Sequence, residues 1–198
     1  ASPMSGSAEH DARATVAQPV SVPGDQASDT ERGRKRMAAL IELGRQFAID
    51  QAPLALLQQV CASSREMTSA EYAVLGVLSA DGIDVATCLS SGLEQGAVTG
   101  FSSELRSGAV LGPVLDSRRP LRLLNPGGDA SILGLPASHP PAFSYLAVPI
   151  ASPTRVYGWL SLGNKHDAAG FTDADEQVTG LLAVQAAVAF ENALRAQS

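Results

Sequence analysis

Aromatic side chains are scarce in this chain: they make up 5% of its 198 residues, whereas hydrophobic residues as a whole make up 45%. We therefore expect a mostly aliphatic core, in which each aromatic residue needs an explanation of its own. Only two cysteines are present, Cys61 and Cys88, and they form neither a CxxC pair nor a disulfide framework. This usage favours a reducing compartment, and we expect the protein in the cytoplasm.

Long apolar runs and clustered positive charge are also lacking. No stretch reaches the roughly 18 apolar residues that cross a bilayer, and the N-terminus has no charged region followed by an apolar one, as a signal peptide would. The formal net charge is -6. Binding to nucleic-acid phosphates requires a clustered basic face. We therefore expect neither a membrane nor a nucleic acid as a partner.

Catalytic signatures are missing as well. The sequence contains no G-x-S-x-G elbow, no P-loop and no Rossmann glycine fingerprint. Its three histidines are scattered, and no HExxH or CxxC spacing suggests a zinc site. These absences predict that the protein is not an enzyme.

The composition changes near residue 28. Residues 1–28 are rich in Ala, Ser, Pro, Gly and Gln and nearly devoid of large apolar side chains, which predicts a disordered leader. Residues 29–198 carry regular apolar patterns and are expected to form one domain. The domain is expected to begin with a helix after Asp29 and to continue with a second helix after Asp50. The apolar stripe of the first helix is Met37, Leu40, Ile41, Gly44 and Phe47.

Short apolar runs then indicate strands over 72–78, 85–89, 121–124, 145–150 and 156–162. A short helix is expected over 109–115 and a long Gly/Pro-rich loop over 125–142. Thr172 caps a final helix that reaches about Arg195, and one face of this helix is expected to carry Val178, Leu181, Leu182, Gln185, Val188 and Ala189. This order predicts an α+β fold, in which N- and C-terminal helices cover one face of an antiparallel sheet.

Two sequence segments carry a family resemblance. Residues 145–150 read Tyr-Leu-Ala-Val-Pro-Ile, and residues 157–162 read Tyr-Gly-Trp-Leu-Ser-Leu. Together with Phe-Thr-Asp-Ala-Asp-Glu at 171–176 and the Ala-rich helix that follows, they resemble the GAF family over about residues 35–196. The resemblance implies a sensory domain that binds a small ligand in a pocket under loops, on the sheet face opposite the terminal helices.

A narrower resemblance lies in the predicted loop. Residues 134–141, Gly-Leu-Pro-Ala-Ser-His-Pro-Pro, are similar to the first GAF domain of the dormancy-survival redox and oxygen sensor histidine kinases. This resemblance implies that haem b binds with His139 as the proximal iron ligand, and that the domain senses a diatomic gas or a redox state. Those sensors carry a distal Tyr where this chain has Ser161.

Four further residues complete the predicted ligand site. The aromatic residues expected nearest to the loop are Phe143, Tyr145, Tyr157 and Trp159, and we assign Phe143, Tyr145 and Trp159 to the site. Strand alternation places Ser161 on the same face as Trp159. Two alternatives remain open: a regulator that binds a nucleotide or a metabolite, and a ligand-free dimerisation module whose own side chains fill the pocket. The resemblance also implies a homodimer through the terminal helices, and a histidine kinase or another output partner.

Overall fold

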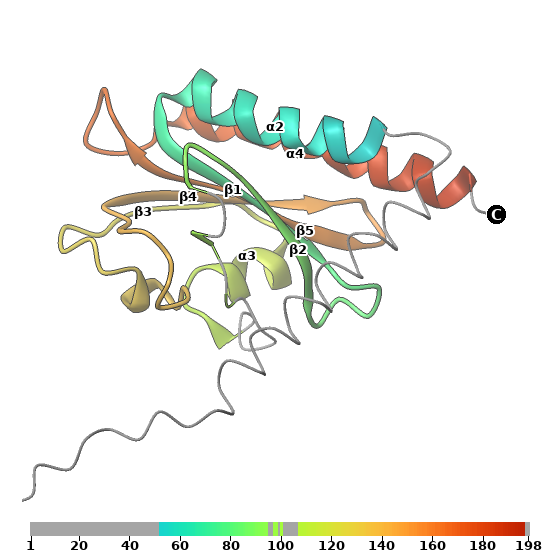
Figure 1. The fold of residues 1–198 in the computed structure, drawn as a ribbon, viewed down its shortest axis with the longest axis horizontal. Helices are drawn as coiled ribbons and strands as arrows, with labels where there is room; N and C mark the ends of the chain where they lie inside the picture. The colour runs from blue at the N-terminus through green and yellow to red at the C-terminus, as the bar shows by residue number, and fades with distance from the viewer. Residues whose placement is uncertain (1–51, 95–96, 99, 101–106, 197–198) are drawn as a thin grey trace, which may run out of the picture.

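The computed structural model describes residues 52–94, 97–98, 100 and 107–196. The predicted leader and the predicted helix after Asp29 lie outside these residues. The described chain is a mixed α+β domain (Figure 1), which confirms the predicted fold class. Its elements are α2 (Ala52–Thr68), β1 (Ala70–Leu78), β2 (Val85–Ser91), α3 (Leu111–Ser117), β3 (Leu121–Leu124), the 3₁₀ helix η2 (Ala130–Leu133), β4 (Ser144–Ala151), β5 (Val156–Lys165) and α4 (Asp173–Ala196).

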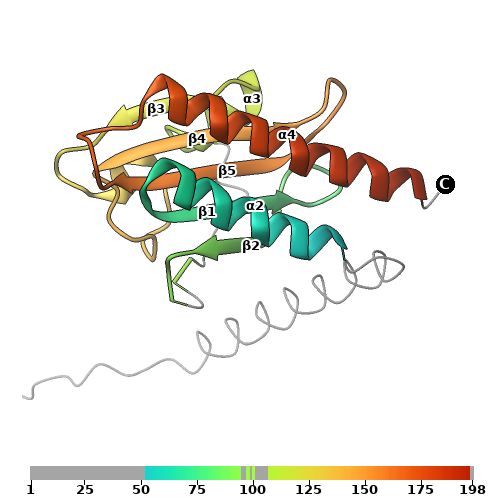
Figure 2. The ribbon, with the colours of Figure 1, turned by 90° about the horizontal axis from the view of Figure 1, so that it is seen from above.

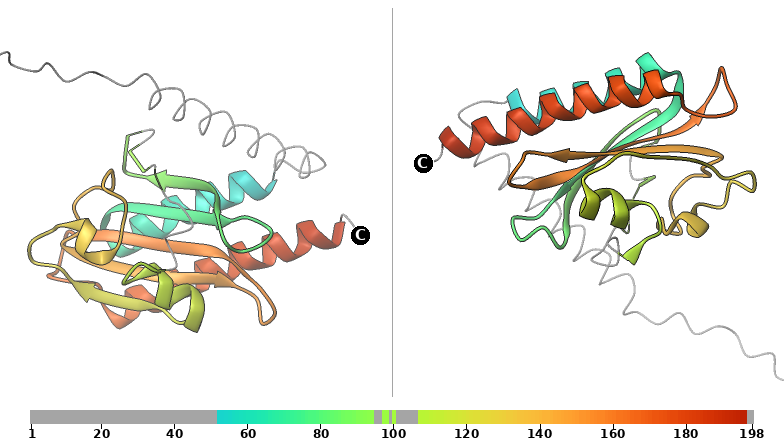
Figure 3. Two further views of the ribbon diagram at one scale, coloured as in Figure 1. Left: turned by 90° about the horizontal axis from the view of Figure 1, so that it is seen from below. Right: turned by 180° about the vertical axis from the view of Figure 1, so that it is seen from behind.

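The five strands form one antiparallel sheet in the order β2-β1-β5-β4-β3. Helices α2 and α4 lie beside each other over one face (Figure 2). Helix α3 and the connection from β3 to β4, which contains η2, lie on the other side (Figure 3). The sheet is therefore covered on both faces, by helices on one and by a short helix with loops on the other.

Strand register divides the core into two clusters. Leu160 of β5 pairs with Leu75 of β1 and Val148 of β4, and all three belong to the cluster beneath α2 and α4. Trp159, one position away, belongs to the cluster on the opposite face. Because side chains alternate along a strand, Ser161 shares the face of Trp159, as predicted.

The second helix is confirmed, with Leu57, Val60 and Cys61 buried against the sheet. The start of α4 is confirmed too. The Thr172 amide donates to Asp175 Oδ2 (2.8 Å), and the Asp175 amide donates to Thr172 Oγ1 (3.2 Å), which is the reciprocal bonding of a capping box.

The apolar face predicted for α4 lies mostly on the outer side of the helix. Leu181 is 67% exposed and Val188 51%, whereas the buried positions are Asp175, Thr179, Ala183, Ala186, Ala187 and Phe190. Small side chains let the helix approach the sheet and α2 closely, so the alanine stripe is the inner face. The larger aliphatic residues Leu181 and Val188 point outward.

Two local predictions also need correction. The short helix begins at Leu111 rather than 109 and ends at Ser117, followed by Arg118 in the left-handed region (φ 56). The long loop contains η2, whose first amides are capped by Asp129: its side chain accepts from the Ser131 amide. A capped turn of this length is too short to leave a periodic apolar pattern in the sequence.

Candidate ligand site

The candidate site is built on a glycine near the end of a central strand. Gly163 of β5 pairs with Tyr72 of β1 on one side and with Tyr145 of β4 on the other. A Cβ atom at Gly163 would lie 2.0 Å from Tyr72 Cζ, so the absence of a side chain makes room for the phenol ring. Both tyrosines are fully buried.

His139 lies against this pair of rings. Its ring centroid is 5.6 Å from that of Tyr72 and 6.2 Å from that of Tyr145, and both contacts are edge-to-face. The backbone amide of His139 donates to Pro136 O (2.9 Å), which closes the turn before the two prolines. Only 7% of His139 is exposed. The loop therefore places a buried imidazole against the sheet.

The hydrogen bonding of His139 defines its tautomer. Its Nδ1 lies 2.8 Å from Pro140 O. A carbonyl oxygen can only accept, so Nδ1 carries the proton and Nε2 keeps its lone pair. Burial lowers the pKa of His139, against the opposing effect of the bond to Pro140. The side chain is therefore a neutral imidazole with Nε2 as its basic atom, which is the form that ligates metals.

The remaining polar groups at the site are uncharged too. Burial raises the pKa of Tyr145, and the hydrogen bond with the Ser161 hydroxyl acts in the opposite direction. Burial likewise raises the pKa of Tyr72, helped by Tyr145 and by the carboxylate of Glu71. Ser161 Oγ donates to Val74 O (3.3 Å). The site combines a neutral base with two neutral phenols.

Trp159 and Phe143 occupy different environments. Trp159 is fully buried, and its ring lies where a Cβ on Gly76 would stand, 2.1 Å from Trp159 Cη2. Phe143 is 52% exposed and packs over Gly128 at the rim of the loop. The structure thus brings His139 and Tyr145 into contact and places Trp159 and Ser161 on their face of the sheet, but it leaves Phe143 at the surface.

Sequence patterns alone did not reveal Tyr72 and Asn164 as site residues. Tyr72 contacts His139 from β1, and Asn164 binds the backbone on both sides of Ala142. Tyr72 is the first residue of the first predicted strand. Because aromatic residues are scarce in this chain, its presence there could have indicated a role in the site. Its contact with a residue far along the chain depends on the pairing of β1 with β5, which no local pattern reveals.

Other reactive groups lie elsewhere. Cys61 is in the cluster beneath the helices, where burial raises its pKa to about 12, and His166 is exposed in a turn. No group of three or more His, Cys, Asp or Glu side chains suited to a metal ion occurs among the described residues.

A family model for the GAF domain matches residues 51–191, most of the chain. The chain belongs to the GAF domain family. Proteins of this family are generally sensory or regulatory modules for small ligands, and the sheet face that carries His139 is the corresponding candidate site. None of the helices in the described residues has both the length and the apolar character to cross a membrane.

Solved GAF domains share the fold at low sequence identity. The GAF domain of an Acinetobacter phosphoenolpyruvate-protein phosphotransferase is 17% identical, covers 81% of this chain and 95% of its own, and has a TM-score of 0.61. A GAF domain/HD domain protein from Geobacter sulfurreducens is 18% identical over 75% and 97%, with a TM-score of 0.59. The second GAF domain of DevS from Mycobacterium smegmatis is 20% identical over 74% and 99%, with a TM-score of 0.55. Likeness at this level establishes the fold and not the ligand.

Proposed function

We propose that this GAF domain senses a small ligand that contacts His139, and that the ligand is haem b. One observation carries the proposal: a buried neutral imidazole whose Nδ1 is held by Pro140 O and whose Nε2 remains basic. A proximal histidine is commonly oriented by such a bond from its other ring nitrogen. The donor chemistry therefore fits haem.

The residues of the site have separable tasks in this proposal. His139 Nε2 would hold the iron, while the rings of Tyr72 and Tyr145 fix the imidazole plane from two sides. Buried apolar residues such as Leu135 and Ala147 exclude water from the same face. When bound, haem supplies an iron centre that responds to diatomic gases or to redox conditions.

The test is absorbance. The protein is expressed with added haem precursor, or reconstituted with haemin, and its spectrum is compared with that of His139→Ala. We expect a Soret band in the parent that is lost or displaced in the variant. His166→Ala is the matched control, because His166 is exposed and outside the site; its spectrum should equal that of the parent. A parent without a Soret band after reconstitution contradicts the haem proposal.

A second candidate is a ligand-free module that fills its own pocket. The observation in its favour is the depth of packing on this face: Tyr145 and Trp159 are 0% exposed, and Leu111 of α3 is 1% exposed. If haemin and other small ligands, including nucleotides and metabolites, leave the melting temperature unchanged, this candidate is the better one. A shift with a nucleotide or metabolite alone would indicate a non-haem regulator.

We also propose that the domain acts as a homodimer in the cytoplasm and passes its signal to a histidine kinase or another output partner. Leu181, Val184 and Val188 form an exposed apolar stripe on α4, and such stripes commonly pair between chains. Both cysteines, Cys61 and Cys88, are thiols rather than halves of a disulfide, which supports a reducing compartment.

A further inference from the structure

Asn164 has an unusual backbone conformation at the end of β5. Its φ is 59°, in the left-handed region that non-glycine residues rarely adopt. Asn is one of the few side chains that tolerate this region, because its short polar group bonds to nearby backbone. The conformation turns the Asn164 side chain toward the loop that carries His139.

The side chain of Asn164 forms three hydrogen bonds. Its Oδ1 accepts from the Phe143 amide (2.7 Å), and its Nδ2 donates to Pro141 O (2.9 Å). Nδ2 also donates to Glu71 Oε2 (2.9 Å) on β1. We call residues 139–143 the His139 segment. Asn164 thus holds this segment at two backbone positions, and Tyr72 adds a third bond from its hydroxyl to Pro141 O (3.2 Å).

The next residue, Lys165, reaches to the other side of the sheet. Its side chain is 7% exposed, and its Nζ lies 3.0 Å from Asp175 Oδ2 at the start of α4 and 3.0 Å from Asp167 Oδ1. Nζ also donates to Thr68 O (2.9 Å) at the end of α2. Burial disfavours the charge of Lys165, but the bonds to Asp175 and Asp167 outweigh it and raise the pKa.

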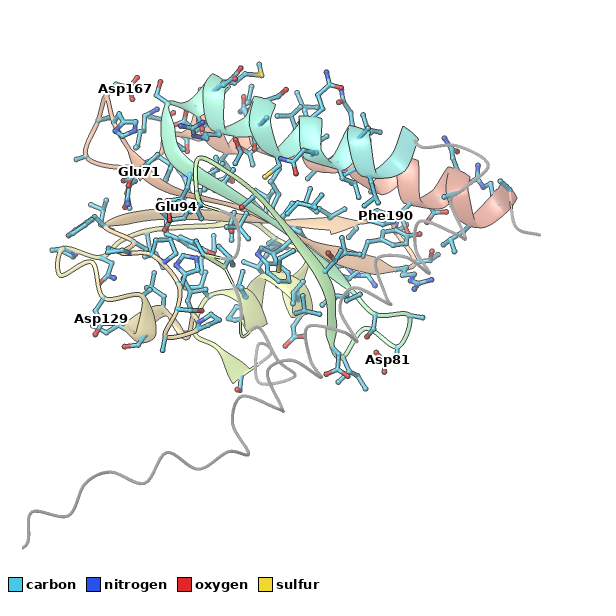
Figure 4. The ribbon with its side chains drawn as sticks, viewed as in Figure 1. Glu71, Asp81, Glu94, Asp129, Asp167 and Phe190 are labelled. Carbon is cyan, nitrogen blue, oxygen red and sulfur yellow. The ribbon has the colours of Figure 1, made fainter. Side chains whose placement is uncertain are left out.

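Glu71 and Asp167 are labelled in Figure 4 at the same end of the molecule, and each is bonded to one member of this pair. Regular alternation from Leu160 and Ser161 would place Asn164 on the helix side and Lys165 on the His139 side, but the left-handed backbone at Asn164 interrupts it. The Asn164 side chain bonds to the His139 segment, whereas Lys165 bonds to the ends of α2 and α4. One peptide unit therefore joins the two sets of bonds.

We infer that Asn164 is the positioning residue of the His139 segment, and that the Asn164–Lys165 pair couples this segment to α2 and α4. A displacement of the His139 backbone changes the bonds at Asn164, which share a peptide with the Lys165 contacts to both helices. The role in sensing rests on the proposed function, since it takes His139 as the ligand contact. The coupling itself is a property of the ligand-free domain.

The positioning half is tested with Asn164→Gly in the ligand-free protein. Glycine keeps the left-handed backbone and removes only the side-chain bonds. We expect amide exchange at Phe143 to become about tenfold faster, because its acceptor is gone. The His139 ring ¹⁵N signals should shift as well, which a side chain with a merely local role would not cause. Unchanged ring signals would overturn the positioning role.

The coupling half is tested with Lys165→Met. We expect faster exchange in the first turn of α4 together with a shift of the His139 ring signals. The matched control is Arg122→Met: Arg122 also binds the start of α4, through Asp173, Glu176 and Phe171 O, but from β3. The Arg122→Met variant should show faster exchange in the same turn and unchanged His139 ring ¹⁵N signals.

A Lys165→Met variant that behaves as the control does, with no His139 shift, overturns the coupling. If this variant does not fold, Asp167→Ala removes one of the two carboxylates at Lys165 and is judged by the same two signals. Because every measurement uses protein without haemin, failure here is distinct from the absence of a Soret band.

Discussion

At the scale of single residues, His139 and Lys165 contrast two ways of treating a buried titratable group. Burial removes the water that would solvate an imidazolium, and the hydrogen bond from His139 Nδ1 to Pro140 O satisfies the neutral form equally well. The side chain of Lys165 is also largely buried, but it has two carboxylates within 3.0 Å. The first residue is therefore held neutral and the second charged.

This difference predicts a pH dependence of stability. The folded pKa of His139 lies below its ordinary value of 6.5. As pH falls below that value, the unfolded chain binds a proton that the folded chain resists, so the free energy of unfolding decreases. The contribution is complete above pH 6.5 and declines below it, with a slope of at most about 1.4 kcal/mol per pH unit.

The measurement is urea unfolding of the ligand-free parent and of His139→Gln between about pH 5 and about pH 7.5, a range that brackets the titration of an ordinary histidine. The difference in the free energy of unfolding between the two proteins should decrease toward acid pH, because only the parent has a buried histidine that resists protonation. A difference that stays constant across this range would mean that His139 is not desolvated in solution.

At the scale of elements, β5 carries most of the site-forming features. Its glycines leave room for the Tyr72 ring and for the backbone of β1, and the side chains of its last two residues bond to opposite sides of the sheet. Alternation along β5 could be predicted from the sequence, and so the common face of Trp159 and Ser161 was correct. The roles of Gly163, Asn164 and Tyr72 could not, because they follow from register with β1 and β4 and from one left-handed residue.

The close approach of β1 to the Trp159 ring gives a test of the strand packing. In Gly76→Ala the new Cβ would lie 2.1 Å from a fully buried ring that has no room to retreat. We expect a loss of roughly 1–3 kcal/mol in the free energy of unfolding. Chemical denaturation monitored by Trp159 fluorescence measures it.

Gly180→Ala on α4 is the matched control, since, apart from its chain neighbours and the nearby backbone of its own helix, no atom of the described residues lies within 4 Å of the position that a Cβ would take there. The same substitution in a helix interior should stabilise the protein by about 0.5–1 kcal/mol. Equal effects of the two substitutions would contradict the close packing of Gly76 against Trp159.

Helix α4 shows why element type was easier to predict than orientation. Its capping residues and length are local features, and they were predicted correctly. Its orientation is decided by how closely it can pack on α2 and the sheet, and alanines satisfy that requirement better than leucine or valine does. The apolar face that the sequence indicates is therefore mostly the outer stripe, and the inner face is the alanine face.

At the scale of the whole molecule, the two faces of the sheet have different outer surfaces. One layer ends in α4 with its exposed stripe, and the other ends in loops. The layered α+β architecture could be predicted from the order of periodic segments. The depth of packing on the His139 face could not, because it depends on how the connection from β3 to β4 folds back onto the sheet.

The outer stripe predicts assembly through α4. Val184 is 56% exposed at its centre, and Val184→Glu would bring two carboxylates together across a symmetric contact. We expect the parent to sediment as a dimer and this variant as a monomer. Ile132→Glu is the control, because Ile132 is 66% exposed but lies on η2, away from α4. Two monomeric variants, or a monomeric parent, would contradict assembly through this stripe.

The strand order has a consequence for how the chain reaches its fold. β1 and β5 are neighbours in the sheet, and Ala70 pairs with Lys165 across most of the length of the domain. Such non-local pairing raises contact order and slows folding, because loop-closure entropy is lost before the pairing can compensate for it. During synthesis, β1 can pair with β2 but cannot pair with β5 until β5 has left the ribosome. Fragments that stop before β5 should expose an unpaired strand edge and be prone to aggregation.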